Sequence, residues 1–260
     1  MATSSNSNKV TVIREKVINF ENLEKQGINL HQTVKIQEWE KYFTLLDGPT
    51  YPQLVREFWN NAFIKEKKAN TTPVIETRVL GCSITITPTD IAELIRCSEK
   101  GIDIEKYRYN SGLEPSIIRK LYDFSGNKTE TKSLKPVANL WYKILVSNFM
   151  PKEETGLALT IDKHFLYFIM MKQKINLPLT IFNYMKSCIE ISRKGNLDFI
   201  PYGRVISELL NQRGIVKKAR CSRITDYLAK SWGSPLQTVE EREETSSQSY
   251  SSYSPCILGF

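Results

Sequence analysis

Residues 51–63 read Tyr-Pro-Gln-Leu-Val-Arg-Glu-Phe-Trp-Asn-Asn-Ala-Phe, and this stretch decides how the chain around it folds. Pro52 suits the first turn of a helix, where its missing N–H would have had no partner. The apolar residues then recur at steps of three and four, which is the spacing of one helix face; they are Leu54, Val55, Phe58, Trp59, Ala62 and Phe63. We therefore expect an amphipathic helix that buries a broad aromatic face.

A second apolar stripe precedes this helix, and the turn Asp47-Gly48-Pro49 separates the two. The stripe keeps helical spacing over Ile36, Trp39, Phe43 and Leu46. Two aromatic-faced helices with a tight break between them should pack on each other, and each buried ring contributes roughly 2–3 kcal/mol of transfer free energy. We expect the rings of both stripes to face inward as core. The alternative is a set of exposed rings on which nucleic-acid bases stack.

After Pro73 the apolar period changes from 3.6 residues to 2. Two β-branched runs, 74–79 and 83–87, lie on either side of Leu80-Gly81-Cys82, which indicates a β-hairpin. A helix start follows, in which Thr87 can be the N-cap, Pro88 the first helical residue and Asp90 the third. The third position usually carries Glu or Gln, so the predicted capping box is imperfect.

Helical periodicity also marks most of the remaining chain. A helix is predicted from Val10 to Gly27, with an apolar stripe over Val10, Ile13, Val17, Phe20 and Leu23, and His31 should lie in the loop that follows. Further helices are predicted at 115–122, 136–149, 160–171, 177–195 and 201–213. The predicted fold class is therefore mainly α: a helical globular domain with one small β-hairpin near residues 74–87.

The expected organisation is one folded domain between two tails. Residues 1–9 are polar and serine-rich, and residues 233–260 are acidic and then serine-rich, so we expect a disordered tail at each end. Residues 10–232 should form the helical domain. A polar linker near 125–135 marks where this domain could divide into two lobes.

The chain resembles a plant family catalogued as putative plant transposon proteins. In the first half the resemblance rests on Trp39, the Leu-Val-Arg-Glu-Phe-Trp-Asn-Asn run of the 51–62 helix, the turn Val79-Leu80-Gly81, and Ile84, Ile86 and Ile91. In the second half it rests on Leu140-Trp141, Met150-Pro151, the 162–171 helix, Ile175-Asn176-Leu177-Pro178 and the 201–216 helix. It covers roughly Val10 to Val216, and departs from the family in a lysine-rich middle and a short tail. The resemblance implies an origin in plant retroelements and supplies no catalytic residues.

The chain is basic overall, and its positive charges are unevenly distributed along the sequence. The formal net charge is +8, and the isoelectric point is about 9.1, which favours anionic partners. The densest cluster of cations consists of Arg213, Lys217, Lys218, Arg220, Arg223 and Lys230, with short helical patterns on both sides of Gly214. This layout is compatible with a helix-turn-helix that binds nucleic-acid phosphates, and Lys217-Lys218-Ala219-Arg220 is a candidate nuclear import signal. The alternative is an ordinary solvated basic surface.

No catalytic motif or metal-ligand pattern stands out, so we expect no enzyme, no catalytic residues, no metal and no cofactor. The histidines are His31 and His164; the first should be an ordinary exposed side chain and the second should lie at the boundary of the core. A metal-dependent transposase would need converging carboxylates. The scattered acids that could supply them are Asp90, Asp123, Asp162, Asp198 and Asp226.

The first functional hypothesis is a non-enzymatic, retroelement-derived interaction protein that binds a protein partner or itself through an apolar groove or a helix face. The alternative is a nucleic-acid-binding module that uses residues 213–230, and the third hypothesis is a metal-dependent transposase or nuclease. No small-molecule substrate is evident. The five cysteines should be free thiols, and the longest apolar run, 165–171, is far short of a membrane span. We expect an intracellular protein, nuclear or cytoplasmic, that is neither secreted nor membrane-bound.

Overall fold

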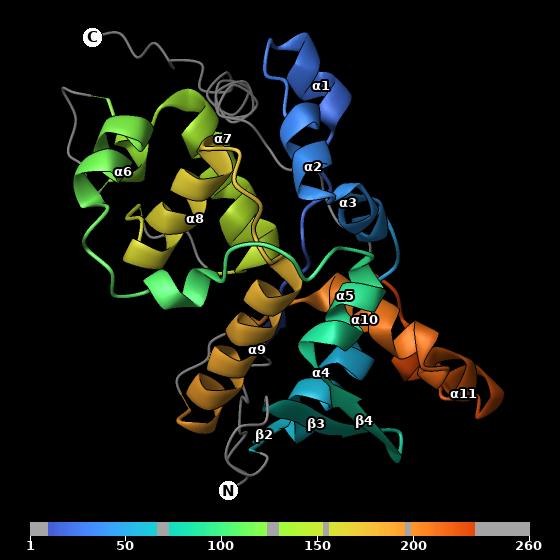
Figure 1. Cartoon of the computed structure of the whole chain (residues 1–260). Helices are drawn as coiled ribbons and strands as arrows, with labels where there is room; N and C mark the ends of the chain where they lie inside the picture. Colours follow the sequence, from blue (N-terminus) through green and yellow to red (C-terminus); the bar gives the residue numbers. More distant parts are fainter. Residues whose placement is uncertain (1–9, 67–72, 124–129, 153–155, 196–198, 232–260) are drawn as a thin grey trace, which may run out of the picture.

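The computed structural model describes residues 10–66, 73–123, 130–152, 156–195 and 199–231. Within these ranges the chain is mainly α-helical with a small three-stranded antiparallel sheet, which confirms the predicted fold class (Figure 1). The helices are α1 (Phe20–Lys25), α2 (His31–Gln37), α3 (Glu40–Leu46), α4 (Pro52–Asn61), α5 (Pro88–Ile95), α6 (Glu114–Leu121), α7 (Pro136–Ile144), α8 (Thr160–Met170), α9 (Leu177–Arg193), α10 (Gly203–Gln212) and α11 (Ile215–Cys221). The strands are β1 (Thr11–Val12), β2 (Phe63–Lys65), β3 (Val74–Val79), β4 (Cys82–Ile86) and β5 (Phe199–Ile200).

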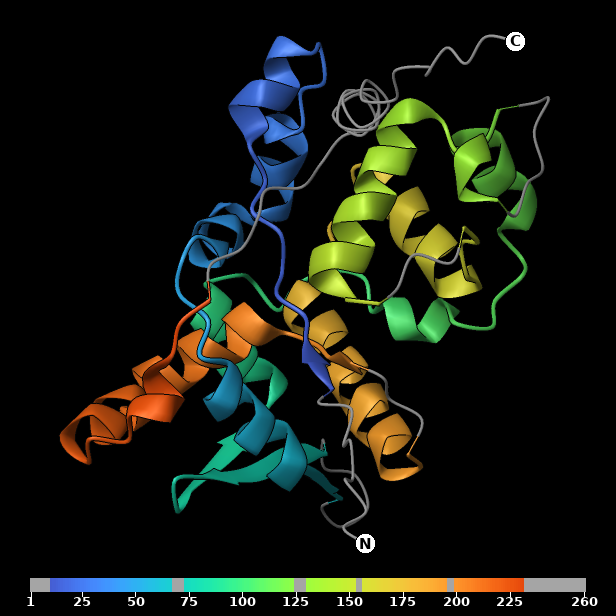
Figure 2. The ribbon, with the colours of Figure 1, turned by 180° about the vertical axis from the view of Figure 1, so that it is seen from behind.

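Shorter helical turns complete the fold. They are the 3-10 turns η1 (Ile104–Tyr107), η2 (Thr131–Ser133) and η4 (Thr225–Leu228), and the π-helical turn η3 (Leu145–Phe149), which extends α7 as predicted. Helices α6 to α8 gather on one side of the molecule, α4, α5, α10 and α11 gather with the sheet on the other, and α9 passes between them (Figures 1 and 2). None of the helices in the described ranges has the length and apolarity that a bilayer crossing requires.

Helix α4 forms where the aromatic segment predicts it, but it ends two residues early. Pro52 occupies its first turn, and its buried face includes Phe58 and Trp59. Ala62 is already extended, with φ −71° and ψ 136°. Phe63 therefore leaves the helix and pairs with Glu76 across β2 and β3, where its ring is 39% exposed. The inclusion of Phe63 in the helix face was wrong, because strand pairing overrides its helical spacing.

The predicted hairpin is confirmed and has a third strand. Strands β3 and β4 pair from Val79 with Cys82 to Ile75 with Ile86, and β2 adds to the other side of β3. The capping box of α5 also forms: the Asp90 N–H donates to Thr87 Oγ1 at 3.2 Å, and the Thr87 N–H donates to Asp90 Oδ2 at 2.9 Å. The shorter acidic side chain thus serves at the third position.

The second apolar stripe, from Ile36 to Leu46, is divided between two helices and does not form one. Helix α2 ends at Gln37, its C-cap Glu38 has a left-handed φ of 60°, and α3 begins at Glu40 after its N-cap Trp39. His31 begins α2, so its placement in a loop was wrong. The rings nevertheless face inward as predicted, with exposed fractions of 1% for Trp39, 8% for Phe43, 0% for Phe58 and 7% for Trp59. Trp39 lies 4.7 Å from Phe149 between ring centroids, so this core joins helices from distant parts of the sequence.

The predicted helix over 10–19 is wrong. This segment is extended, β1 pairs in parallel with β5, and helix starts only at Phe20. Its most buried side chains are Glu15 and Ile18, neither of which belongs to the predicted stripe. Pairing of Ile200 with β1 also delays α10, which begins at Gly203 and not at Pro201. Long-range strand pairing therefore replaces helical spacing at both places.

The predicted organisation into tails and lobes concerns residues that are mostly outside the described ranges. Residues 1–9, 124–129 and 232–260 lie outside them. Tyr122, just before the linker, and Leu134, near its end, form an antiparallel bridge. The division into two lobes near 125–135 stays a prediction.

Candidate functional site

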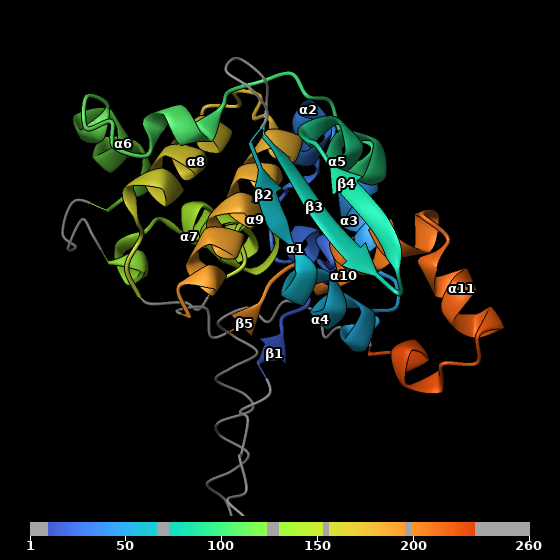
Figure 3. The same ribbon diagram turned by 90° about the horizontal axis from the view of Figure 1, so that it is seen from below.

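The basic segment lies at one end of the molecule, where α11 follows α10 (Figure 1). Gly214 connects the two helices with a φ of 76°, a conformation that glycine adopts without strain. Helix α11 buries Ile215, Val216 and Ala219, while its cationic residues are exposed. Two short helices therefore do flank Gly214, and their junction lies beside the β3–β4 hairpin (Figure 3).

The structure divides the six predicted cations into two groups. Arg213 Nη2 lies 2.5 Å from Asp90 Oδ1 at the start of α5. Lys218 Nζ donates to the carbonyl of Leu80 at 2.8 Å and lies 3.2 Å from Cys82 Sγ. These two side chains fasten the α10–α11 junction to the hairpin and to α5. Asp90 compensates the charge of Arg213, whereas Lys218 is bound to a neutral carbonyl and keeps its charge.

The other four cations are exposed and have no ion-pair or hydrogen-bond partner among the described residues; they are Lys217, Arg220, Arg223 and Lys230. Within 214–231 the acidic residue is Asp226, which is also exposed. We call these four side chains the basic end. A cluster of like charges on a solvent-facing surface produces a positive potential that attracts anions.

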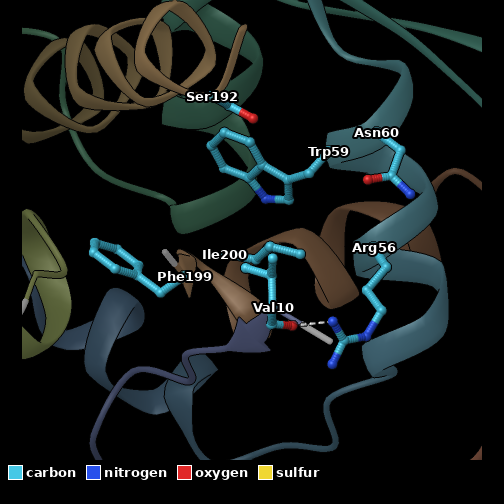
Figure 4. A pocket seen from close by; sticks show the side chains of 7 residues that line it. All are labelled: Val10, Arg56, Trp59, Asn60, Ser192, Phe199 and Ile200. Carbon is cyan, nitrogen blue, oxygen red and sulfur yellow. Dashed lines mark hydrogen bonds between the residues drawn. The ribbon is translucent and has the colours of Figure 1, made fainter. Parts of the chain in front are cut away.

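A cavity of about 250 Å³ lies between α4, the end of α9 and the β1–β5 pair (Figure 4). The residues that line it are Val10, Arg56, Trp59, Asn60, Ser192, Phe199 and Ile200. Arg56 donates to the carbonyl of Val10 across it. The indole N–H of Trp59 is buried and has no acceptor among the described residues. The sequence predicted Trp59 as core, and no pattern indicated that its edge would line a cavity.

A second, wider hollow of about 510 Å³ lies over the sheet. Its lining includes the exposed ring of Phe63 and the side chains of Arg78, Ser83 and Thr85. The hollow is polar and open, in contrast to the apolar groove that the first functional hypothesis expected.

Three buried polar groups serve the fold. Glu15 accepts the N–H groups of Arg204 and Val205 at 2.8 and 3.0 Å, so it caps α10 from a distant part of the chain. Burial raises the pKa of the Glu15 carboxyl, while these N–H bonds and Arg204 oppose that change. Asp162 lies 2.7 Å from Lys152 Nζ. His164 is wholly buried, deeper than the core boundary that we expected, and its Nδ1 lies 2.9 Å from the carbonyl of Thr160.

The thiols within the described ranges are free, at Cys82, Cys97, Cys188 and Cys221. Burial raises the pKa of Cys97 to about 12, and that of Cys188 to about 12 as well. Thiols that stay protonated at neutral pH are poor nucleophiles and poor metal ligands. Across the described parts of the chain, no three His, Cys, Asp or Glu side chains gather as a metal site would require. Asp198, one of the scattered acids, lies outside those parts.

Comparison with known proteins bears on the origin of the chain. Residues 35–216 match a family model described as a putative plant retrotransposon-related domain. The match confirms the resemblance, although it begins 25 residues after Val10 and excludes Lys217, Lys218, Arg220, Arg223 and Lys230. No curated protein and no solved structure matches the chain. Because the matched residues make up well over half of its length, the chain belongs to the putative plant retrotransposon-related domain family.

Proposed function

We propose that this chain is a non-enzymatic interaction domain whose basic end binds the phosphate backbone of a nucleic acid. The observation that carries the proposal is the set of four exposed cations at one end of the molecule: Lys217, Arg220, Arg223 and Lys230. A cation that is already paired within the protein gains little binding free energy from a phosphate. An unpaired cation that binds a phosphate displaces counterions from the nucleic acid, and their release favours binding.

We propose no enzymatic role because the buried polar groups form bonds within the fold. Glu15, Asp162 and His164 are each held by a bond that stabilises the fold: a helix N-terminus, a lysine and a helix carbonyl. Catalytic acids and bases usually face a substrate cavity. None of these three lines either of the two hollows described above.

The arrangement of the cations also supports phosphate binding, because α11 carries them on its solvent-facing side. Lys217 and Arg220 are three positions apart on α11, which places them on neighbouring parts of one helix face. Arg223 follows just after the helix ends, with a φ of 54°. Phosphates are spaced along a nucleic-acid strand, so a row of cations can contact several of them without reading the bases.

The test is a triple charge reversal, Lys217→Glu with Arg220→Glu and Arg223→Glu. Binding to a labelled DNA duplex and to a single-stranded RNA is measured by fluorescence anisotropy at several salt concentrations. For the wild type we expect log K to fall with log salt with a slope of about −3 to −4, since each DNA phosphate neutralised contributes about −0.9. The triple variant should bind at least about tenfold more weakly and with a shallower slope.

The matched control reverses three other exposed lysines, Lys25→Glu, Lys35→Glu and Lys41→Glu, on α1, α2 and α3. It changes the net charge by the same amount but leaves the basic end intact. The proposal is abandoned if the triple variant binds as tightly as the wild type, if wild-type binding does not depend on salt, or if the control loses as much affinity. Circular dichroism of both variants shows that a lost affinity is not lost folding.

A further inference from the structure

Strand β4 has an open edge, and the hairpin geometry identifies which main-chain groups occupy it. The turn Leu80-Gly81 has two residues, both with positive φ, of 47° and 75°. In a hairpin of this kind the flanking residues, here Val79 and Cys82, form a hydrogen-bonded pair, and bonded and non-bonded pairs then alternate. Ser83 and Thr85 therefore direct their N–H and C=O groups away from β3.

The opposite side of the hairpin supports this assignment. Arg78, which pairs with Ser83, should direct its carbonyl away from β4 by the same alternation. The carbonyl of Arg78 does accept from Asn61 Nδ2 at 2.7 Å, on the α4 side of β3. The alternation that assigns the open edge of β4 is therefore consistent with an independent contact.

The edge is free and unprotected within the described residues. Ser83 and Thr85 are exposed, and neither makes a hydrogen bond to another described residue across that edge. Figure 3 shows β4 at the outside of the sheet, with β3 on one side and no strand on the other. Proteins usually protect such an edge with a charge, a proline or a bulge. Strand β4 reads Cys-Ser-Ile-Thr-Ile and has none of these.

The cations around the edge indicate what could pair with it. Lys218 Nζ lies at the turn end, where it donates to the neutral carbonyl of Leu80, whereas Arg213, near the other end, is paired with Asp90. Arg78 is exposed and lies opposite Ser83 on the outer face of the sheet. Glu76 lies opposite Thr85 on the same face but is paired with Lys65 at 2.8 Å, and Glu57 accepts the N–H of Leu80 at 2.8 Å. The uncompensated charges near the edge are therefore those of Arg78 and Lys218 against that of Glu57. This small positive excess disfavours a basic segment and a second copy of the same edge with its own cations.

We propose that β4 is a docking edge for an extended, acidic peptide segment of a partner protein, which adds as a fourth strand. Main-chain bonds to Ser83 and Thr85 supply affinity, and alternate acidic side chains next to Arg78 and Lys218 supply selectivity. The inference is independent of nucleic-acid binding, because it depends on main-chain groups of β4 and not on the basic end.

The test uses a proline that blocks the edge without breaking the hairpin. The N–H of Thr85 faces outward, so Thr85→Pro removes a donor that β3 does not use, and edge positions of this kind tolerate proline. Thr85→Val is the matched control, because it keeps the N–H and the β-branched shape. The probe is a labelled nine-residue peptide of alternating Glu and Val, compared with one of alternating Lys and Val, with anisotropy as the measurement.

We expect the acidic peptide to bind and to slow hydrogen exchange at the amides of Ser83 and Thr85. Thr85→Pro should weaken its binding at least about tenfold, with Thr85→Val unchanged and the lysine peptide at least about tenfold weaker. No binding of the acidic peptide, equal binding by Thr85→Pro, or protection of these amides by self-association without peptide would overturn the proposal. DNA binding by Thr85→Pro should equal that of the wild type, which separates this test from that of the basic end.

Discussion

The stretch from α4 to α5 and the segment 10–19 both pack against α10, yet they acquire their structure in different ways. In the first stretch the contact between α4 and the sheet is made by residues that are near in sequence: Thr77 Oγ1 donates to the carbonyl of Phe58 at 2.7 Å. The segment 10–19 bonds to residues far along the chain: the Lys16 N–H donates to Asn148 Oδ1 at 2.6 Å. A sequence pattern is informative in the first case because residues nearby in the sequence supply the bonding partners.

The largest effect is expected from a substitution in the stretch from α4 to α5, whose structure is determined by residues near in sequence. Phe58→Ala removes a ring that is 0% exposed on the buried face of α4, the helix that contacts β3. We expect the free energy of unfolding to fall by about 3–5 kcal/mol, because the substitution removes apolar burial and leaves a cavity. Urea unfolding followed by circular dichroism measures the change.

Phe63→Ala is the control, since Phe63 is the same residue type, lies five positions later and is 39% exposed. It should cost under about 1 kcal/mol, because most surface substitutions have small effects. Equal losses in the two variants would show that the α4–sheet contact is not the main source of stability in this stretch.

Much of the fold was predictable because helix faces, the hairpin turn and the cap of α5 are local patterns. The segment 10–19 was not, because its apolar residues have helical spacing by accident of composition, while β5, Asn148 and α10 determine its conformation. The candidate site shows the same limit. The basic residues were visible in the sequence, but the fastening of Arg213 and Lys218 depends on Asp90 and Leu80, more than 120 positions away.

A smaller loss of stability is expected from a substitution in the segment 10–19, which bonds to distant parts of the chain. Glu15→Ala leaves the N–H groups of Arg204 and Val205 without their acceptor in a buried place. We expect the free energy of unfolding to fall by about 2–4 kcal/mol, because each buried unsatisfied group costs about 1–3 kcal/mol. Urea unfolding measures the loss. It should appear although Glu15 lies outside the matched residues 35–216.

Glu21→Ala is its control, an exposed glutamate in the first turn of α1. That change should cost less than about 1 kcal/mol, the usual size of a favourable charge near a helix N-terminus. If Glu15→Ala were as mild as Glu21→Ala, the segment 10–19 would be an accessory to the fold and not part of its core.

The smallest expected effect returns to the local stretch and concerns the cap of α5. Thr87→Ala removes the hydroxyl that accepts the N–H of Asp90 at 3.2 Å and donates to Asp90 Oδ2 at 2.6 Å. We expect a loss of about 1 kcal/mol, the typical cost of replacing an N-cap threonine by alanine. Thr87→Ser keeps the hydroxyl and should stay within about 0.5 kcal/mol of the wild type. Urea unfolding distinguishes the two variants. If alanine and serine cost the same, then the strand pairing of Ile86 and the packing of Ile91 and Ile95 hold the start of α5, and even here the local pattern reports a structure that tertiary contacts maintain.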